Sequence, residues 1–297
     1  MWQAQHVSSL LRQAAPERDV ELIEVSTIGD RDRSEPLSQM GGMGIFTREV
    51  QSAVLDGRAD MAVHSLKDLP TESVEGLTLA GVPDRGPRFD VLVLPQLHAG
   101  TVTSLDDVAQ GARIGTGSLR RQAQLLHTRP DLVMTEIRGN VETRLRKLDE
   151  GEYDAIVLAA AGLKRLELAD RISLMLEPPV MFPAVGQAAL GIECRSDDEV
   201  TQEVLNRITD SNTLSEVTAE RACLRELRAG CHAPVGVLSE ITKVDRLTLT
   251  AVVLSGDGQQ RVTTTCEGPA SDADELGRQL AIDLSRKGAD ALLATKD

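Results

Sequence analysis

The sequence predicts an α/β protein of two or three domains that ends in a small α+β domain. Segments typical of strands and of helices alternate over residues 20–160, as in parallel sheets that helices cover on both faces. The chain has 297 residues, which is more than one hydrophobic core usually serves. Aromatic residues make up only 2% of it, so the core must consist of Leu, Val, Ile and Ala, which suits helices packed on sheets.

Apolar spacing, capping residues and turn residues predict the elements of the first part of the chain. These are a helix over 3–15, a strand over 20–25, a loop over 26–42, a helix over 47–55, and strands over 61–66 and 77–80. The Gly/Pro/Arg-rich segment 82–88 is predicted to cross between two domains.

The same signals predict the elements of the middle and of the C-terminal part. The middle contains strands over 91–94, 113–115, 132–134 and 153–159, with helices that begin at Ser104, Ser118 and Asn140. The C-terminal part contains a helix over 214–227, a hairpin of strands 247–253 and 261–265 joined at Gly256-Asp257-Gly258, and a helix over 273–293.

Composition and charge exclude several classes of protein. With 41% hydrophobic residues the chain is globular, and its net charge of −14 argues against non-specific binding of nucleic acid. No apolar run approaches the roughly 20 residues of a membrane span, and the N-terminus lacks the basic and apolar parts of a secretory signal. We expect a cytoplasmic monomer without membrane or nucleic-acid partners, on which a local basic pocket could still bind an anion.

The predicted strand over 61–66 ends abruptly in charge, at Lys67 and Asp68. In open α/β sheets, ligands bind at the carboxyl ends of strands, so Asp68 is our candidate for the catalytic residue. The alternative is a surface ion pair between these two side chains. His64 and Ser65 are not a catalytic pair, because neighbouring side chains of a strand point to opposite faces.

Two glycine turns carry arginines at the start of predicted helices. The first includes Thr116, Ser118, Arg120 and Arg121, and the second, over 138–144, repeats the pattern of Gly, cap and arginine. Arginines there oppose the helix dipole unless an anion is bound, so the two turns predict a site for a ligand with several carboxylates. The alternative is that these arginines pair with the abundant Asp and Glu. Neither turn matches a dinucleotide or P-loop motif.

The four cysteines neither form a disulfide framework nor pair as Cys-x-x-Cys, so we expect free thiols and no metal. Cys231 lies in a Gly-Cys-His-Ala-Pro turn, where a thiol is accessible for covalent attachment. Cys194 and Cys223 lie in apolar runs and are expected to pack as small hydrophobic side chains. An incidental surface cysteine is the alternative for Cys231.

Several runs of residues together resemble the porphobilinogen deaminase (hydroxymethylbilane synthase) family, in the same order and spacing over almost the whole chain. They are 64–70 (His-Ser-Leu-Lys-Asp-Leu-Pro), 115–122, 138–140 with 143–144, 153–166, 183–187 with 191–195, and 218–221 with 230–231. The resemblance implies two lobes like those of periplasmic binding proteins and a small α+β third domain. The implied ranges are 1–83 with 189–206, 91–182, and 211–297.

The resemblance also implies an activity and a set of roles. A dipyrromethane cofactor is attached through a thioether to Cys231, four porphobilinogen molecules are joined to it head to tail with loss of ammonia, and water releases hydroxymethylbilane. The aspartate that matches Asp68 handles protons and stabilises the cation as the azafulvene forms. Side chains implied to bind the acetate and propionate groups are Lys67, Thr116, Ser118, Arg120, Arg121, Arg138, Arg144 and Arg165, and those implied to contact the substrate are Gln3, Phe46 and Gln187.

The sequence departs from the family pattern at three places. Family members usually carry a strand with an Arg and a Ser before the run Trp-Gln-Ala, which here begins at Trp2. The usual Gly-Gly-Lys-Gly has Met43 in place of lysine, and the interdomain loop over 86–90 is also different. The alternatives are a weakened or non-catalytic paralogue that binds a tetrapyrrole or another polyanion, and a two-lobed solute-binding protein.

Overall fold

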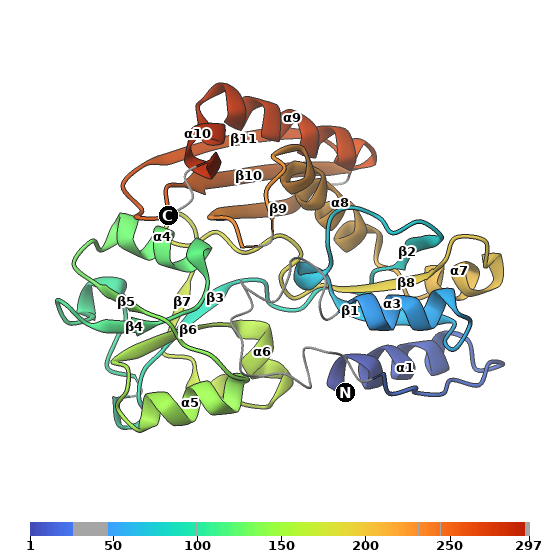
Figure 1. Cartoon of the computed structure of the whole chain (residues 1–297), viewed down its shortest axis with the longest axis horizontal. Helices are drawn as coiled ribbons and strands as arrows, with labels where there is room; N and C mark the ends of the chain where they lie inside the picture. The colour runs from blue at the N-terminus through green and yellow to red at the C-terminus, as the bar shows by residue number, and fades with distance from the viewer. Residues whose placement is uncertain (26–46, 99, 231, 244, 295–297) are drawn as a thin grey trace.

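The computed structural model describes residues 1–25, 47–98, 100–230, 232–243 and 245–294, and these contain three β-sheets (Figure 1). The predicted fold class, α/β with a C-terminal α+β part, is confirmed. The predicted loop over 26–42, Met43, Phe46 and Cys231 lie outside the described residues.

The first sheet has the strand order β1-β8-β2. Its strands are β1 (Met61–Ser65), β2 (Leu77–Gly81) and β8 (Leu190–Arg195), and the helices packed on it are α1 (Trp2–Ala14), α3 (Arg48–Leu55) and α7 (Glu199–Asn206). β8 joins this sheet from far along the chain and lies between β1 and β2, so the first sheet contains segments that lie before and after the second sheet in the sequence.

The second sheet has the order β5-β4-β6-β3-β7. Its strands are β3 (Asp90–Val93), β4 (Arg113–Gly115), β5 (Val133–Thr135), β6 (Ala155–Ala159) and β7 (Leu174–Leu176), and its helices are α4 (Leu119–Thr128), α5 (Val141–Asp149) and α6 (Ala160–Arg165). Leu92 and Val157 belong to one apolar cluster, whereas Val91 and Ile156 belong to another. Successive residues therefore serve opposite faces of the sheet, as expected for strands buried on both sides.

The prediction of parallel sheets is wrong for the first sheet and holds only in part for the second. β8 runs antiparallel to both β1 and β2, and β3 runs antiparallel to β6 and β7. Among the described strands, only β4 pairs in parallel, with β5 and β6, through the crossover helices α4 and α5. β3 and β8 enter their sheets from the other lobe, so no crossover helix brings them in parallel to their neighbours.

The C-terminal part is an antiparallel sheet with helices on one face. It consists of α8 (Ser211–Glu226), β9 (Val235–Lys243), β10 (Arg246–Leu254), β11 (Arg261–Pro269), α9 (Ala273–Arg286) and α10 (Ala289–Ala294). The predicted hairpin is β10–β11, whereas β9 was not predicted. The single helix predicted over 273–293 is wrong, because Gly288 has φ +98 and separates α9 from α10.

Three other predictions concern starts and ends of elements. The prediction of a strand over 20–25 is wrong, because no described strand pairs with this segment and Ile23 is 53% exposed. Asn140 caps α5 by accepting from the amide of Thr143 at 2.9 Å, as predicted, but Ser118 makes no such bond to α4. Ser104 forms the predicted capping box on a single 3₁₀ turn.

Two segments, over 82–89 and 177–189, connect the lobes and hydrogen-bond to each other. Gln187 donates to the carbonyl of Arg88 at 2.8 Å and accepts at its own carbonyl from Arg85 at 2.9 Å. Arg85 also forms an ion pair with Glu220 of α8 at 2.6 Å, so the C-terminal part contacts this crossing.

Each sheet falls within one of the predicted domain ranges, except that β3 begins at Asp90. The ranges themselves stay a prediction. None of the helices in the described ranges combines the length and the apolar character that crossing a membrane requires.

Candidate active site

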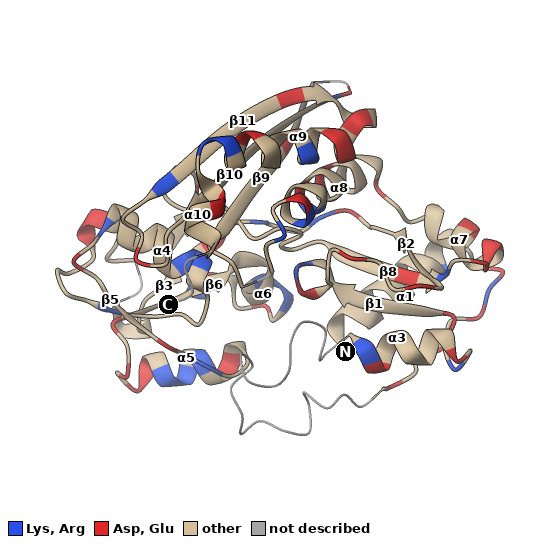
Figure 2. Cartoon of the chain, turned by 45° about the horizontal axis from the view of Figure 1, so that its top comes forward, with Lys and Arg blue, Asp and Glu red and all other residues tan. Residues whose placement is uncertain are grey.

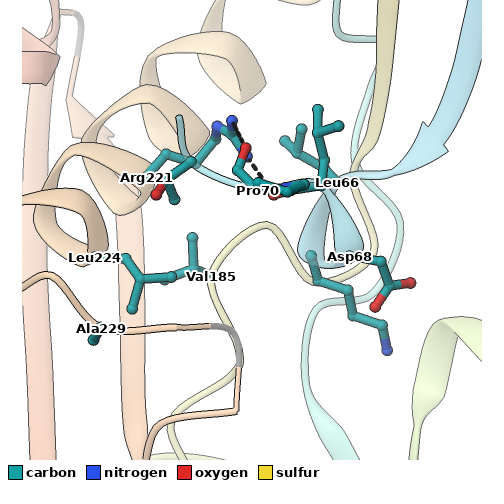
Figure 3. A pocket seen from close by; sticks show the side chains of 10 residues that line it. Leu66, Asp68, Pro70, Val185, Arg221, Leu224 and Ala229 are labelled. Atoms are coloured by element: carbon teal, nitrogen blue, oxygen red, sulfur yellow. Dashed lines mark hydrogen bonds between the residues drawn. The ribbon is translucent and has the colours of Figure 1, made fainter. Parts of the chain in front are cut away.

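The turn after β1 presents charge where the apolar strand ends. Leu66–Asp68 form a 3₁₀ turn whose first amide donates to the carbonyl of Ala189 at 3.0 Å. Leu66 is buried, whereas Lys67 is half-buried and Asp68 is exposed. Figure 3 shows the carboxylate of Asp68 turned away from Arg221, and both residues line a small pocket that is partly open to solvent.

Lys67 lies within the electrostatic influence of both lobes. Burial lowers the pKa of its ammonium group, and Asp68 opposes this shift. Arg121 and Arg120, at the start of α4 in the other lobe, lower the pKa further, and Asp90 of the same lobe opposes them. The turn after β1 and the start of α4 therefore lie near each other, and Figure 2 shows Lys and Arg in both segments.

Arg120 and Arg121 are buried and share one carboxylate, that of Asp90. The distances are 2.7 Å from Arg120 Nη1 and 2.8 Å from Arg121 Nη2 to the oxygens of Asp90. Burial alone would raise the pKa of Asp90, but the two guanidinium groups outweigh it and hold that pKa well below its usual range. The sequence left two possibilities for these arginines, a bound anion or an acidic side chain of the protein. The structure shows that both pair with an acidic side chain, Asp90. Gln187 donates to the same carboxylate at 3.0 Å.

The second arginine turn contains one surface pair and one cation without such a pair. Arg138 is exposed and donates to Glu136 at 2.7 Å. Arg144 donates to the carbonyl of Gly139 at 2.8 Å, and within the described ranges no carboxylate pairs with it. Burial lowers the pKa of Arg144, and Arg121 lowers it further, so these two cations lie near each other. A pair of neighbouring guanidinium groups, one lacking a carboxylate, favours an anion there.

Arg165 and Gln3 bring α6 and α1 to the same region. Arg165 donates to the carbonyl of Ala188 at 3.2 Å, and burial lowers the pKa of its guanidinium group. Gln3 donates to the hydroxyl of Ser65 at 3.3 Å, two residues before Lys67. Both side chains thus border the end of β1.

Thr116 and Ser118 lie on the turn before α4. The hydroxyl of Thr116 is buried and accepts from the amide of Ser118 at 3.2 Å, which fixes the shape of the turn. His64 lies 2.9 Å from Glu193, on the opposite side of β1 from Ser65, so the exclusion of a His64–Ser65 catalytic pair is confirmed.

Sequence reasoning missed Asp90 and Arg221. Asp90 is a lone carboxylate at the start of a wholly buried strand, and that placement is a signal that cations must lie close by. Arg221 donates to the carbonyls of Leu69 and Pro70. It lies on a helix among other charged residues, so no local pattern marks it as Asp90 is marked.

Two family models match the chain. "Porphobilinogen deaminase, dipyromethane cofactor binding domain" matches residues 1–203, and "Porphobilinogen deaminase, C-terminal domain" matches residues 214–286. The chain belongs to the porphobilinogen deaminase family. A porphobilinogen deaminase of Syntrophotalea carbinolica is 45% identical over 297 residues, covering 100% of this chain and 92% of the relative. The predicted membership in this family is confirmed.

Similar solved structures are more distant than this relative. The BvgS VFT2 domain of Bordetella pertussis, a double mutant, is 18% identical with a TM-score of 0.42, over 74% of this chain and 82% of that one. An ancestral cationic amino acid solute-binding protein is 13% identical with a TM-score of 0.41, over 69% and 77%.

Porphobilinogen deaminases are transferases of tetrapyrrole biosynthesis that use a dipyrromethane cofactor, and this chain matches the cofactor-binding model. The site fits such a group. A dipyrromethane with acetate and propionate side chains needs several cations that are not already neutralised. Lys67, Arg144 and Arg165 meet this need, because none of them has an ion pair with a carboxylate among the described residues.

Proposed function

We propose that Asp68 is the catalytic carboxylate of a hydroxymethylbilane synthase and that Cys231 attaches its dipyrromethane cofactor. The reaction joins four porphobilinogen molecules head to tail with loss of ammonia, and water then releases hydroxymethylbilane. The observation that supports the role of Asp68 best is its exposed position at the end of β1, where Lys67 lies within the influence of Arg120 and Arg121 of the other lobe.

The chemistry requires a carboxylate at this point. When the carbon–nitrogen bond of the aminomethyl group breaks, its electron pair leaves with ammonia, and the pyrrole that remains is cationic. A fixed carboxylate stabilises that charge as it develops, and it can accept or return the pyrrole proton. We assign both tasks to Asp68, because it is the exposed carboxylate of the turn.

The remaining predicted residues bind and orient. We propose that Lys67, Arg144 and Arg165 contact the carboxylates of the substrate directly. Arg120 and Arg121 are largely engaged by Asp90, so their contribution is mainly to the positive potential of the site. Roles in shaping or contacting the site stay assigned to Gln3, Phe46, Thr116, Ser118, Arg138 and Gln187.

The attachment at Cys231 is tested by intact-mass measurement. When bound, the dipyrromethane supplies the pyrrole carbon to which the first substrate is added. The wild-type protein, purified after expression with porphobilinogen available, should carry the mass of two linked pyrrole units. The variant Cys231→Ser should lack it, whereas Cys266→Ser, which removes a half-buried free thiol, should keep it.

A bare polypeptide mass for the wild type would contradict the proposed attachment. A loaded protein that releases no hydroxymethylbilane would identify a non-catalytic paralogue. We also propose that the enzyme acts as a monomer in the cytoplasm. Light scattering of the loaded protein measures its molar mass in solution and so tests whether it is a monomer.

A further inference from the structure

Arg221 of α8 holds the chain immediately after Asp68. Its Nη1 donates to the carbonyl of Leu69 at 3.0 Å, and its Nη2 donates to the carbonyl of Pro70 at 2.7 Å. Figure 3 shows both hydrogen bonds between Arg221 and the chain near Leu66. One guanidinium group therefore fixes two successive peptide units that follow the proposed catalytic carboxylate.

This guanidinium group is half-buried, and no carboxylate among the described residues forms an ion pair with it. It donates instead to the two carbonyls. Burial lowers the pKa of Arg221 to about 10, and the more distant Glu193 offsets only part of that shift. Burying a charge is costly, and perturbed cations of this kind concentrate at functional sites.

The neighbouring residue of α8 binds a second segment that packs against the same turn. Glu220 accepts from the amide of Gly186 at 2.7 Å. Gly186 has φ +67, and a Cβ there would lie 3.1 Å from the carbonyl carbon of Leu66 and 3.2 Å from the amide nitrogen of Lys67. The turn that carries Asp68 thus packs against Gly186 and continues into Leu69 and Pro70. α8 binds Gly186 through Glu220 and the other two residues through Arg221.

The same helix leads to the proposed attachment point of the cofactor. Leu224 and Ala229 line the pocket that Lys67 and Asp68 also line. Ala229 precedes Cys231 by two positions. α8 and the residues after it are therefore a common support for Asp68 and for the segment that leads into Cys231.

We propose that Arg221 is a positioning residue, which holds Asp68 at a fixed distance from the growing pyrrole chain by tying its turn to α8. This inference rests on the proposed function of Asp68. Displacing a catalytic group by about 1 Å can lower a rate by about a hundredfold, so the loss of two hydrogen bonds at this turn should be visible in turnover.

The test compares Arg221→Gln with the wild type, both loaded with cofactor as verified by intact mass. We expect kcat to fall by about tenfold or more, while KM for porphobilinogen changes by less than about threefold, because the substrate-binding cations are untouched. Arg225→Gln is the matched control. Arg225 lies one turn further along α8 and donates to Asp274 at 2.6 Å at the surface, so this variant should keep the wild-type kcat. A kcat for Arg221→Gln within about twofold of wild type would overturn the proposal.

The variant Arg221→Lys protects the test against loss of folding. Lysine keeps the charge but lacks the planar fork that reaches two carbonyls, so its kcat should lie between those of Arg221→Gln and the wild type. If Arg221→Gln does not fold, Arg221→Lys takes its place, and a kcat for Arg221→Lys within about twofold of wild type would then overturn the proposal. Failure of both variants to fold would show a purely structural role and would also overturn the proposal.

A double-mutant cycle separates this proposal from the role of Asp68 itself. In an Asp68→Glu background the carboxylate is already displaced, so adding Arg221→Gln should lower kcat by less than about threefold. An undiminished effect in that background would mean that Arg221 does not act through Asp68. Near-normal turnover by Asp68→Asn alone would instead refute the proposed function, whatever the cycle shows.

Discussion

Arg165 of α6 lies over the ring of Trp2 of α1, with 5.1 Å between the guanidinium carbon and the ring centroid. The two residues belong to different lobes, and Trp2 also stacks on His6 at 4.9 Å. A substrate carboxylate that binds Arg165 would compete with this cation–π contact. Trp2 is the single tryptophan of the chain, so all of the tryptophan emission comes from the residue that makes this contact.

We therefore predict that porphobilinogen changes the emission of Trp2 in the wild-type protein. In Arg165→Gln the emission should already be altered before substrate is added, and substrate should change it little further. Lys164→Gln, which removes a neighbouring exposed cation, should respond as the wild type does. Equal responses from Arg165→Gln and the wild type would argue against a substrate contact at Arg165.

Asp90 should be among the most sensitive positions for stability. Replacing it by asparagine leaves Arg120 and Arg121 buried without their carboxylate, and breaking a buried ion pair in this way costs about 3–5 kcal/mol. Urea unfolding measures the loss. Glu267→Gln removes the exposed partner of Arg246 and should cost no more than about 1 kcal/mol. Equal losses in the two variants would contradict the structural role of Asp90.

The same carboxylate gives a pH dependence with a defined sign. Its pKa in the folded protein lies below the ordinary value of 3.8, because Arg120 and Arg121 outweigh the effect of burial. The folded state therefore binds fewer protons than the unfolded state in the range below 3.8. The stabilisation is complete well above the unfolded pKa of 3.8 and is lost progressively as the pH falls through and below that value.

Denaturant unfolding at a series of pH values tests this dependence. The difference in unfolding free energy between wild type and Asp90→Asn should be constant above about pH 5 and should shrink as the solution is acidified further. A difference that stays constant down to pH 3 would show that Asp90 does not carry a depressed pKa.

Local signals in the sequence were enough to locate the turn of Asp68 and the two arginine turns. A strand that ends in charge and a cap that precedes a helix are properties of neighbouring residues, so Lys67 and Asn140 occupy the predicted kinds of position. The partner of Arg120 could not be predicted in the same way, because Asp90 lies 30 positions away and the contact forms only when β3 has entered its sheet.

Long-range pairing also explains the errors in the fold. β8 reverses the expected strand direction because it returns from the other lobe, which alternation of helix and strand does not reveal. The segment 20–25 has strand-like residues but no described neighbour with which to pair. The membership in the family, by contrast, could be predicted, because its motifs are contiguous runs of sequence.

Turnover by Asp68→Asn is the measurement that tests the central claim most directly. The variant is purified with cofactor, verified by intact mass, and supplied with saturating porphobilinogen beside Glu72→Gln, which alters a nearby exposed carboxylate. Because Asp68 stabilises the cation and moves its proton, we predict that kcat falls by at least about a hundredfold, while Glu72→Gln keeps the wild-type rate. A rate for Asp68→Asn within about threefold of wild type would contradict the assignment of Asp68 as the catalytic carboxylate.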